Sequence, residues 1–382
     1  MTAPAAVDGF VAPGFERVLE EFRRNFAERG EVGAAFAAVR AGEPVVELWG
    51  GIADRGKQRP WAEDTLQAVF SGTKGLVAIC VLIALDRGLL ELEAPVSRYW
   101  PEFGKEEILV RDVVGHTARL PGITHPVSLD EFADPERMAS LLEVEAPSED
   151  PRARLCYHAF TYGWLCAELI RRTDGRSLAR FFADEVAARL ELELWIGLPD
   201  PLEERVSRIE LAPTWPLSLV LDPETHLRDP LVRSIWGNPP TLAPEGFAWN
   251  SRTFHAAEIP GAGAIGTARS IADLYGNLER LLSPPTLELA RTSVSEGWDE
   301  AHATSRRYGV GFELQTMTKS LGPPADAFGH GGAGGSSHGY WPELRVGFSY
   351  AMNLMRDDKP VDARPQALLT ALHRSVSLDA FS

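Results

Sequence analysis

Strand patterns at both ends of the chain, with helical patterns between them, restrict the fold more than any other feature of this sequence. Five runs alternate or are apolar and are bounded by turn residues: 33–40, 44–51, 308–316, 336–341 and 345–353. This order predicts an α/β fold of the α+β kind, in which both ends of the chain build one antiparallel sheet flanked by helices. We expect a sheet domain at 1–64 and 261–382 and an inserted, mostly helical domain at 65–260.

The helices are predicted from apolar spacing, which gives residues 15–26, 76–85, 130–144, 160–175 and 364–376. Gly30 and Gly88 lie where the first two of these helices would end. Residues 199–260, by contrast, are crowded with Pro and Trp and have little periodicity. They predict a long irregular segment of the kind that forms the walls of binding sites.

The charge of the chain excludes one class of partner. Asp and Glu outnumber Lys and Arg by 54 to 38, which gives a net charge of −16, and no basic cluster offsets it. Such a surface repels phosphate backbones, so nucleic acid is not an expected partner. No membrane partner is expected either. The first ten residues lack the features of a signal peptide, and the apolar run at 76–85 falls well short of the ~20 residues that a bilayer requires.

Three cysteines, Cys80, Cys156 and Cys166, form neither a paired framework nor a metal-ligand spacing. They fit a reduced, cytoplasmic location and the role of small buried hydrophobes. The sequence also contains no His-Glu-x-x-His, phosphate-loop or dinucleotide motif. We therefore expect neither a metal nor a cofactor.

The most informative short motif is Ser71-Gly72-Thr73-Lys74, which precedes the apolar run Leu76–Leu85. Residues three apart lie on one face of a helix, so the serine hydroxyl and the lysine amine are expected to meet. A run that is apolar on every side indicates a buried helix, and burial lowers the pKa of a lysine until it can act as a base. A structural interpretation also fits, in which Ser71 caps the helix and the Lys74 stem covers apolar surface.

A second candidate nucleophile is Ser337, in the formal Gly-x-Ser-x-Gly pattern of residues 335–339. In an α/β-hydrolase this serine follows a strand and precedes a helix. Here a Pro-Glu turn and another strand-like run follow it, and the histidine of a triad would have to be His373, inside a predicted helix. We therefore interpret residues 328–341 as containing a glycine-rich turn between strands.

Further segments complete a familiar order along the chain: His116–Gly122, Tyr157-His158-Ala159 and His330-Gly331-Gly332. With the Ser-x-x-Lys motif they make the chain similar to the serine β-lactamase and penicillin-binding-protein superfamily. Within it, the chain resembles the class C-like carboxylesterases called family VIII esterases. The resemblance extends over roughly residues 30–355.

Two positions depart from the pattern of that superfamily. Ala159 stands where lactamases carry an asparagine, and His330 begins the segment that corresponds to their Lys-Thr-Gly. In lactamases the asparagine and the lysine bind the amide and the carboxylate of the lactam. The departures therefore disfavour penicillin hydrolysis and favour the esterase branch, which relaxes both positions.

The resemblance also implies catalytic roles. Ser71 is the nucleophile, Lys74 is a neutral general base, and Tyr157 shares the proton and passes it to the leaving alcohol. The tetrahedral oxyanion needs two donors, which the resemblance assigns to the backbone N–H groups of Ser71 and Ala333.

The segment His330-Gly331-Gly332 is expected to open a strand, with glycines that let a substrate approach the backbone closely. The same resemblance assigns substrate contacts to these three residues. For His330, two further interpretations are open, a group that orients Tyr157 and an ordinary strand histidine. A structural role is preferred for four other side chains. Tyr162 and Trp164 are interpreted as core aromatic residues, and His116 and Arg119 as part of a loop that braces the helical domain.

The expected activity is hydrolysis of short-chain acyl esters by a cytoplasmic carboxylesterase, with residues 236–254 as a wall of the acyl pocket. A D-amino-acid peptidase, another amide hydrolase, an acyltransferase or a weak β-lactamase is the alternative on the same scaffold. A non-catalytic binding module is a further alternative, but it would have no need of Ser71, Lys74 and Tyr157 together. The partner is then a small-molecule ester, and the sequence leaves the oligomeric state open.

Overall fold

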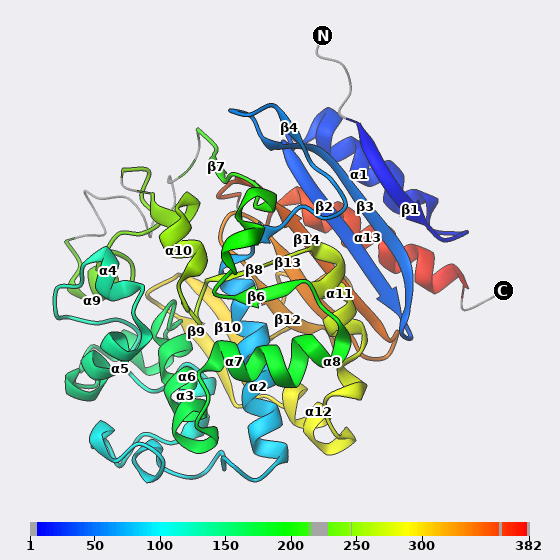
Figure 1. Ribbon diagram of the computed structural model, residues 1–382. Coiled ribbons are helices and arrows are strands. Elements are labelled where there is room, and N and C mark those ends of the chain that lie inside the picture. Colours follow the sequence, from blue (N-terminus) through cyan, green and yellow to red (C-terminus); the bar gives the residue numbers. More distant parts are fainter. Residues whose placement is uncertain (1–5, 214, 216–227, 246, 359–360, 380–382) are drawn as a thin grey trace.

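The computed structural model describes residues 6–213, 215, 228–245, 247–358 and 361–379 (Figure 1). Residues 1–5 lie outside this description, and they include part of the N-terminal stretch that was compared with a signal peptide. Parts of the irregular segment predicted at 199–260 also lie outside it. Among the described residues, none of the helices is both long enough and apolar enough to cross a bilayer.

A large antiparallel sheet forms the centre of the fold. Its strands lie in the order β1 (Val7–Val11), β3 (Glu43–Asp54), β2 (Gly33–Arg40), β14 (Val346–Met352), β13 (Ser337–Trp341), β12 (Phe328–Gly331), β11 (Glu313–Leu314), β10 (Thr304–Tyr308) and β9 (Ser295–Asp299), and the short β4 (Arg59–Pro60) pairs with β3. The pairing of β2 with β14 joins the two ends of the chain, with Ala34 opposite Met352. The predicted α/β fold with one antiparallel sheet built from both ends is therefore confirmed.

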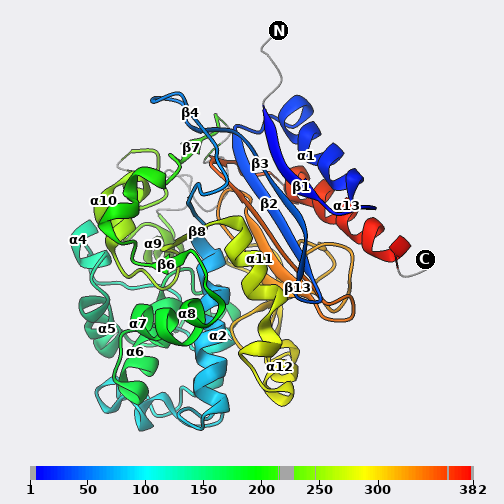
Figure 2. The same cartoon turned by 45° about the vertical axis from the view of Figure 1, so that its right-hand side comes forward.

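Helices cover both faces of this sheet (Figure 2). On one face, α1 (Glu16–Glu28) and α13 (Ala363–Asp379) pack against each other and bury Phe22, Leu368 and Leu372 against the strands. On the other face, α11 (Ala268–Gly276) lies very close to β2 and β14. Small residues make that close approach possible: Ala37, Ala268, Ala272, Gly276, Gly347 and Ala351.

In the helical part of the molecule, α2 (Thr73–Asp86) is buried over nearly its whole length. All of its residues from Thr73 to Ala84 are buried, as the continuous apolar run predicts. The other helices of this part are α3 (Val110–Val114), α4 (Leu129–Phe132), α5 (Pro135–Val144), α6 (Thr161–Asp174), α7 (Leu178–Phe182), α8 (Ala188–Leu190), α9 (Pro230–Trp236) and α10 (Arg252–Ala256). The three cysteines are free and buried, so their predicted role as small hydrophobes is confirmed.

Smaller elements connect this part to the sheet. A three-stranded sheet is formed by β5 (Gln67–Ala68), β8 (Ala264–Gly266) and β6 (Leu194–Ile196), and β5 leads into the short turn before the buried helix. β7 (Glu210–Leu211) pairs in parallel with β15 (Leu354–Met355), and α12 (Pro284–Arg291) leads towards β9.

The helix predicted over residues 130–144 is two helices in the structure. Asp134 accepts hydrogen bonds from two backbone N–H groups at the start of α5, and Pro135 occupies the first turn. An aspartate cap followed by proline is a strong start signal for a helix. The continuous helical prediction was wrong because this signal interrupts it.

Two strand predictions near the C-terminal end also differ. The strand predicted over 308–316 is divided between β10 and β11, and Gly311 adopts a positive φ of 76° between them. His330-Gly331-Gly332 was expected to open a strand, but it ends β12 and leads into a turn. The glycines therefore lie at the end of an interior strand, where the backbone leaves the sheet.

Candidate active site

Ser71 lies in a single 3₁₀ turn directly before α2. The turn covers Phe70–Gly72, and Phe70 adopts a left-handed φ of 47°. Gly72 has no room for a side chain, because a Cβ atom there would lie 2.6 Å from the ring of His338 in β13. The turn is thereby held against the sheet, and Ser71 remains half-buried at the wall of a cavity.

The Lys74 amine is enclosed next to Ser71. Its side chain is fully buried, and Nζ lies 2.6 Å from the carbonyl oxygen of Ala159, 2.7 Å from that of Gly261 and 3.3 Å from Ser71 Oγ. The two carbonyls only accept, so they take both N–H groups of a neutral amine and leave its lone pair for the serine hydroxyl. Burial lowers the pKa of Lys74 to about 7, so the neutral form is available near neutral pH.

Tyr157 lies beside the same amine. Lys74 Nζ and the guanidinium of Arg306 are each 4.9 Å from the centre of the Tyr157 ring. Burial raises the pKa of the Tyr157 phenol, and a hydrogen bond with the Ser71 side chain acts in the opposite direction. The phenol therefore keeps its proton at neutral pH, within reach of Ser71.

A buried carboxylate that the sequence analysis did not single out fixes the backbone of Tyr157. Asp299, at the end of β9, is fully buried and accepts a hydrogen bond from the N–H group of Tyr157 at 2.9 Å. It also lies 2.7 Å from Nδ1 of His302 and 3.9 Å from Nε of Arg306. Burial alone would raise the pKa of Asp299, but the hydrogen bonds from His302 and Tyr157 bring it below its usual value, so the carboxylate is charged.

The glycine-rich stretch 331–335 at the end of β12, called the glycine loop below, approaches Ser71 from the sheet. Gly332 packs so closely that a Cβ atom there would lie 2.2 Å from the carbonyl oxygen of Val69. Val69 directly precedes the turn that contains Ser71. Gly331, Gly332 and Ala333 line the same cavity as the serine, so the backbone of this loop lies next to it.

His330 is buried in the wall of this cavity. Its Nδ1 lies 2.7 Å from the carbonyl oxygen of Gly331, so this nitrogen carries the proton. Its ring centre is 6.0 Å from that of Tyr157. Burial lowers the pKa of His330 to about 4, which leaves the ring uncharged at neutral pH.

A buried ionic network holds the glycine loop from behind. Arg364 in α13 is fully buried and donates a hydrogen bond to the carbonyl oxygen of Gly334 at 3.1 Å. Its other N–H groups bind the carboxylates of Asp362 at 2.6 Å and Glu31 at 3.0 Å. Removing one partner of such a buried pair typically costs about 3–5 kcal/mol, because the remaining charge is left uncompensated.

These groups meet at one cavity of about 400 Å³. Its apolar lining comes from Trp215, Trp236 and Leu242, and its charged lining includes Arg306 and Glu313. A cavity in this range accommodates a small organic molecule. The structure brings together every site residue predicted from the sequence, with Ser71, Tyr157, His330, Gly331, Gly332 and Ala333 in the cavity wall and Lys74 in contact with the serine.

Comparison with known proteins identifies the family. A family model described as Beta-lactamase matches residues 16–372. The chain belongs to the beta-lactamase family. Esterase/beta-lactamase LipL from Mycobacterium tuberculosis (strain ATCC 25618 / H37Rv) is 32% identical over 367 residues, which cover 91% of this chain and 83% of LipL.

Two solved structures are similar to this beta-lactamase family member over their full length. A family VIII carboxylesterase is 32% identical with a TM-score of 0.87, and the match covers 97% of this chain and 100% of that one. A penicillin-binding protein homologue from Caulobacter crescentus is 31% identical with a TM-score of 0.86 and the same coverage. The resemblance inferred from the sequence is confirmed, and the chain is a serine hydrolase of the beta-lactamase fold.

The side chains to which the sequence analysis gave a structural role contact other parts of the protein. His116 is buried, accepts a hydrogen bond from the N–H group of His158 at 3.0 Å, and stacks on Tyr162 at 5.1 Å between ring centres. Arg119 donates to the carbonyl oxygen of Ser148 at 2.8 Å. Trp164 is buried among apolar residues. These contacts join the loop after α3 to the segment that carries Tyr157.

Ser337 occupies a different position in this beta-lactamase family member. It lies within β13, where it is buried and pairs with Gly331 on one side and Tyr350 on the other. The next element is β14 rather than a helix. The interpretation as a glycine-rich turn between strands is confirmed, since a nucleophile elbow requires a helix at this point.

The wall predicted for residues 236–254 is only partly in the cavity. Trp236 and Leu242 line it. Trp249 and Phe254 do not line it. Both are buried in the protein, with their ring centres 5.3 Å apart. The prediction was correct for the first part of this segment and wrong for the second.

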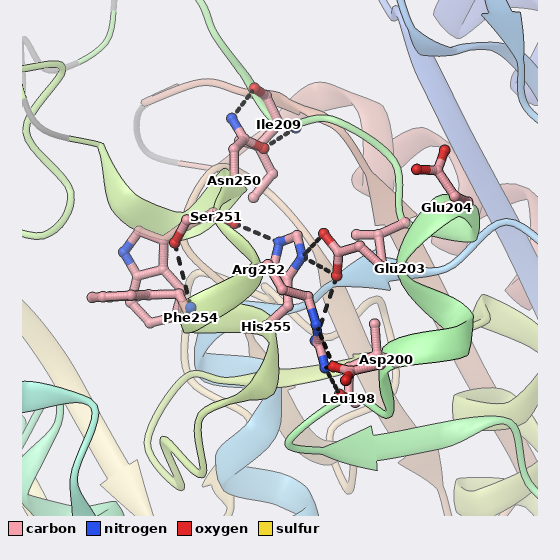
Figure 3. A network of polar contacts seen from close by, with 12 residues as sticks. Leu198, Asp200, Glu203, Glu204, Ile209, Asn250, Ser251, Arg252, Phe254 and His255 are labelled. Atoms are coloured by element: carbon pink, nitrogen blue, oxygen red, sulfur yellow. Dashed lines mark hydrogen bonds and ion pairs between the residues drawn. The ribbon is translucent and has the colours of Figure 1, made fainter. Parts of the chain in front are cut away.

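A polar network holds the second part of that segment in place (Figure 3). His255 lies 2.8 Å from the carbonyl oxygen of Trp249 and 2.9 Å from the carboxylate of Glu203. Asn250 exchanges two hydrogen bonds with the backbone of Ile209, at 2.8 and 2.9 Å. Trp249 in turn packs on Phe70, with 5.1 Å between ring centres. The network therefore supports the turn that contains Ser71 from outside the cavity.

Several polar side chains at this site were missed by the sequence analysis, among them Asp299, His302, Arg306 and Glu313. Arg306 donates to Glu313 at 2.8 Å across neighbouring strands. One signal was present, because Asp299 and His302 are three residues apart, a spacing that lets a carboxylate and an imidazole meet in a turn. For the cross-strand pair there was no local signal.

Proposed function

We propose that this serine hydrolase is a carboxylesterase that cleaves short-chain acyl esters through an acyl intermediate on Ser71. The contacts of Lys74 carry the proposal, since Nζ lies 3.3 Å from Ser71 Oγ and two carbonyl oxygens accept its N–H groups. In the neutral amine this leaves the lone pair for the serine hydroxyl. A serine hydroxyl is a weak nucleophile until a base within hydrogen-bond reach takes its proton. A lysine whose pKa is lowered to about 7 suits that task at neutral pH.

In the acylation step, Ser71 Oγ bonds to the carbonyl carbon of the ester while its proton passes to Lys74 Nζ. The backbone N–H groups of Ser71 and Ala333 stabilise the oxyanion. Collapse of the tetrahedral species breaks the bond to the alcohol oxygen, which takes a proton from the phenol of Tyr157, and Lys74 returns a proton to Tyr157. Water then attacks the acyl-serine in the same way, so that one ester and one water give one acid and one alcohol.

The charges at the cavity favour an ester over a β-lactam. His330 is uncharged because burial lowers its pKa to about 4. Among the described residues of the lining, both arginines are already paired, Arg306 with Glu313 at 2.8 Å and Arg356 with Asp358 at 3.4 Å. The lactam carboxylate would therefore find no unpaired cation among these residues, whereas an uncharged ester requires none.

The name of LipL includes both an esterase and a β-lactamase activity, so lactam hydrolysis is the second candidate. We expect kcat/KM for p-nitrophenyl butyrate to exceed that for the lactam nitrocefin by at least about 100-fold, or about 2.7 kcal/mol of transition-state binding. Both values should be measured on one preparation, with a D-amino-acid amide and an acyl-acceptor alcohol alongside. Equal values, or faster hydrolysis of nitrocefin or of the amide, would contradict the esterase assignment.

The Gly332→Ala variant should lose most of its activity and remain folded. The added methyl group would meet the carbonyl oxygen of Val69 at 2.2 Å and the hydroxyl of Ser336 at 2.3 Å, so the loop would move away from Ser71. A displacement of about 1 Å can cost about 100-fold in rate. The measurement is kcat/KM for p-nitrophenyl butyrate, with thermal melting as the check on folding.

Gly331→Ala is the matched control for this substitution, because a Cβ atom at position 331 would lie at an ordinary 3.4 Å from its nearest neighbour. It should lose much less activity. Equal losses in the two variants would show that the contact with Val69 is not the cause.

A further inference from the structure

The apolar side of the cavity has two indole rings with fixed orientations. Trp236 donates its indole N–H to Nε2 of His302 at 3.1 Å, and Trp215 donates its own to the carbonyl oxygen of Leu242 at 3.1 Å. Both polar atoms are thus bonded to the protein. The remaining surface that Trp215, Trp236 and Leu242 contribute to the cavity is apolar and suits an apolar group of the substrate.

His302 can accept a hydrogen bond from Trp236 only when its Nε2 carries no proton. Its Nδ1 lies 2.7 Å from Asp299 Oδ2, and the charged carboxylate only accepts, so Nδ1 carries the proton and Nε2 has the lone pair. The Sγ atom of Cys156 lies close to the carboxylate of Asp299 and the ring of His302, and three such groups could together bind a metal ion. Both ring nitrogens of His302 are, however, already engaged in hydrogen bonds.

Asp299 connects this arrangement to the reacting groups. The same carboxylate oxygen that binds His302 accepts the backbone N–H of Tyr157. Asp299 is fully buried, and the Arg306 guanidinium is 3.9 Å away. His302 itself lies in the turn between β9 and β10, and its side chain is only 6% exposed. Asp299 therefore fixes Tyr157 directly and fixes Trp236 through His302.

We propose that His302 is a positioning residue that holds Trp236 as the wall of an apolar subsite, and that this wall limits the length of the apolar chain next to the reacting carbonyl. The inference rests on the proposed role of Ser71 as the reacting group. Esters with a short, unbranched acyl chain are the class of substrate that such a wall admits. Without the hydrogen bond that its N–H donates to His302, the indole ring of Trp236 can rotate and the subsite lengthens.

The test compares the rates at which butyl and octyl p-nitrophenyl phosphonates label the protein, followed by intact mass. His302→Leu should raise the octyl-to-butyl ratio of rates by at least about fivefold, since one methylene in an apolar pocket is worth roughly tenfold or more. Trp236→Phe, which keeps a ring but loses the N–H donor, should change the ratio in the same direction. His302→Gln, whose amide can both donate to Asp299 and accept from Trp236, should restore the wild-type ratio.

His125→Leu is the matched control, because His125 is exposed and lies outside this cavity. An unchanged ratio in His302→Leu would overturn the proposal, and so would equal slowing with both probes, which a purely structural role would give. If the wild type is not labelled at Ser71 at all, the proposed function is wrong. The affinities of 2-hexanone and 2-decanone, measured by calorimetry in the same variants, then decide whether His302 limits chain length.

Discussion

The Ser71→Ala variant should lose ester hydrolysis by at least about three orders of magnitude in kcat, because removing the nucleophile of a serine hydrolase disables the whole group that acts with it. The fold should be retained, since the hydroxyl is half-buried at the cavity wall and alanine fits the same turn. The measurements are kcat with p-nitrophenyl butyrate, labelling by a fluorophosphonate with intact mass, and thermal melting.

Ser337→Ala is the matched control for this substitution. Ser337 Oγ is buried without a hydrogen-bond partner among the described residues, and the residue pairs through its backbone. Activity should remain within a few-fold of the wild type, as for other substitutions away from reacting groups. An inactive Ser337→Ala together with an active Ser71→Ala would overturn the assignment of the nucleophile.

Lys74→Arg should be almost as inactive as Lys74→Met, with a loss of about 10²- to 10⁴-fold in kcat/KM in both, which is the range for removing a general base. A guanidinium stays protonated at any working pH and has no lone pair for the serine proton. Lys57→Arg is the matched control, since Lys57 is well exposed and pairs with Glu204 at 3.1 Å. Wild-type turnover in Lys74→Arg would remove the lysine from the mechanism.

The pH dependence of the wild type follows from the same amine. Burial lowers the pKa of Lys74 from 10.5 to about 7, so the folded protein gains the neutral base as the pH rises through about 7. We expect kcat/KM to fall about tenfold per pH unit below that value and to reach a plateau above it. The profile should be recorded with p-nitrophenyl butyrate between pH 5 and 9, after correction for spontaneous hydrolysis. A flat profile would contradict a neutral-lysine mechanism.

The parts of the site that lie close together in sequence could be predicted, whereas the parts built by long-range contacts could not. Ser71 and Lys74 are one helical turn apart, and the apolar run after them indicates burial without knowledge of the fold. The carbonyl oxygens of Ala159 and Gly261, which bind the lysine amine, belong to the backbone and have no side-chain signature. Asp299 has a side chain, but its partner Tyr157 is brought to it only by the fold.

The fold shows the same division. β2 was predicted with the bounds that the structure has, because its apolar residues form an unbroken run between turn residues. β1 and β9 were missed. β1 lies at one edge of the sheet with mostly exposed residues, and β9, at the other edge, alternates partly exposed and exposed residues up to the buried Asp299 at its end. Edge strands bury too little to leave a continuous apolar run in the sequence.

Activity should appear only late in the synthesis of the protein. During translation, Ser71, Lys74 and Tyr157 are synthesised long before β12, β14 and α13. The glycine loop follows β12, and the buried Arg364 that holds it belongs to α13. The central pairing of β2 with β14 must likewise wait for the second of these strands. An incomplete chain therefore carries the proposed nucleophile, Ser71, without the loop to which we assign one of the two oxyanion donors. Unfinished copies of this hydrolase are expected to be catalytically silent in the cell.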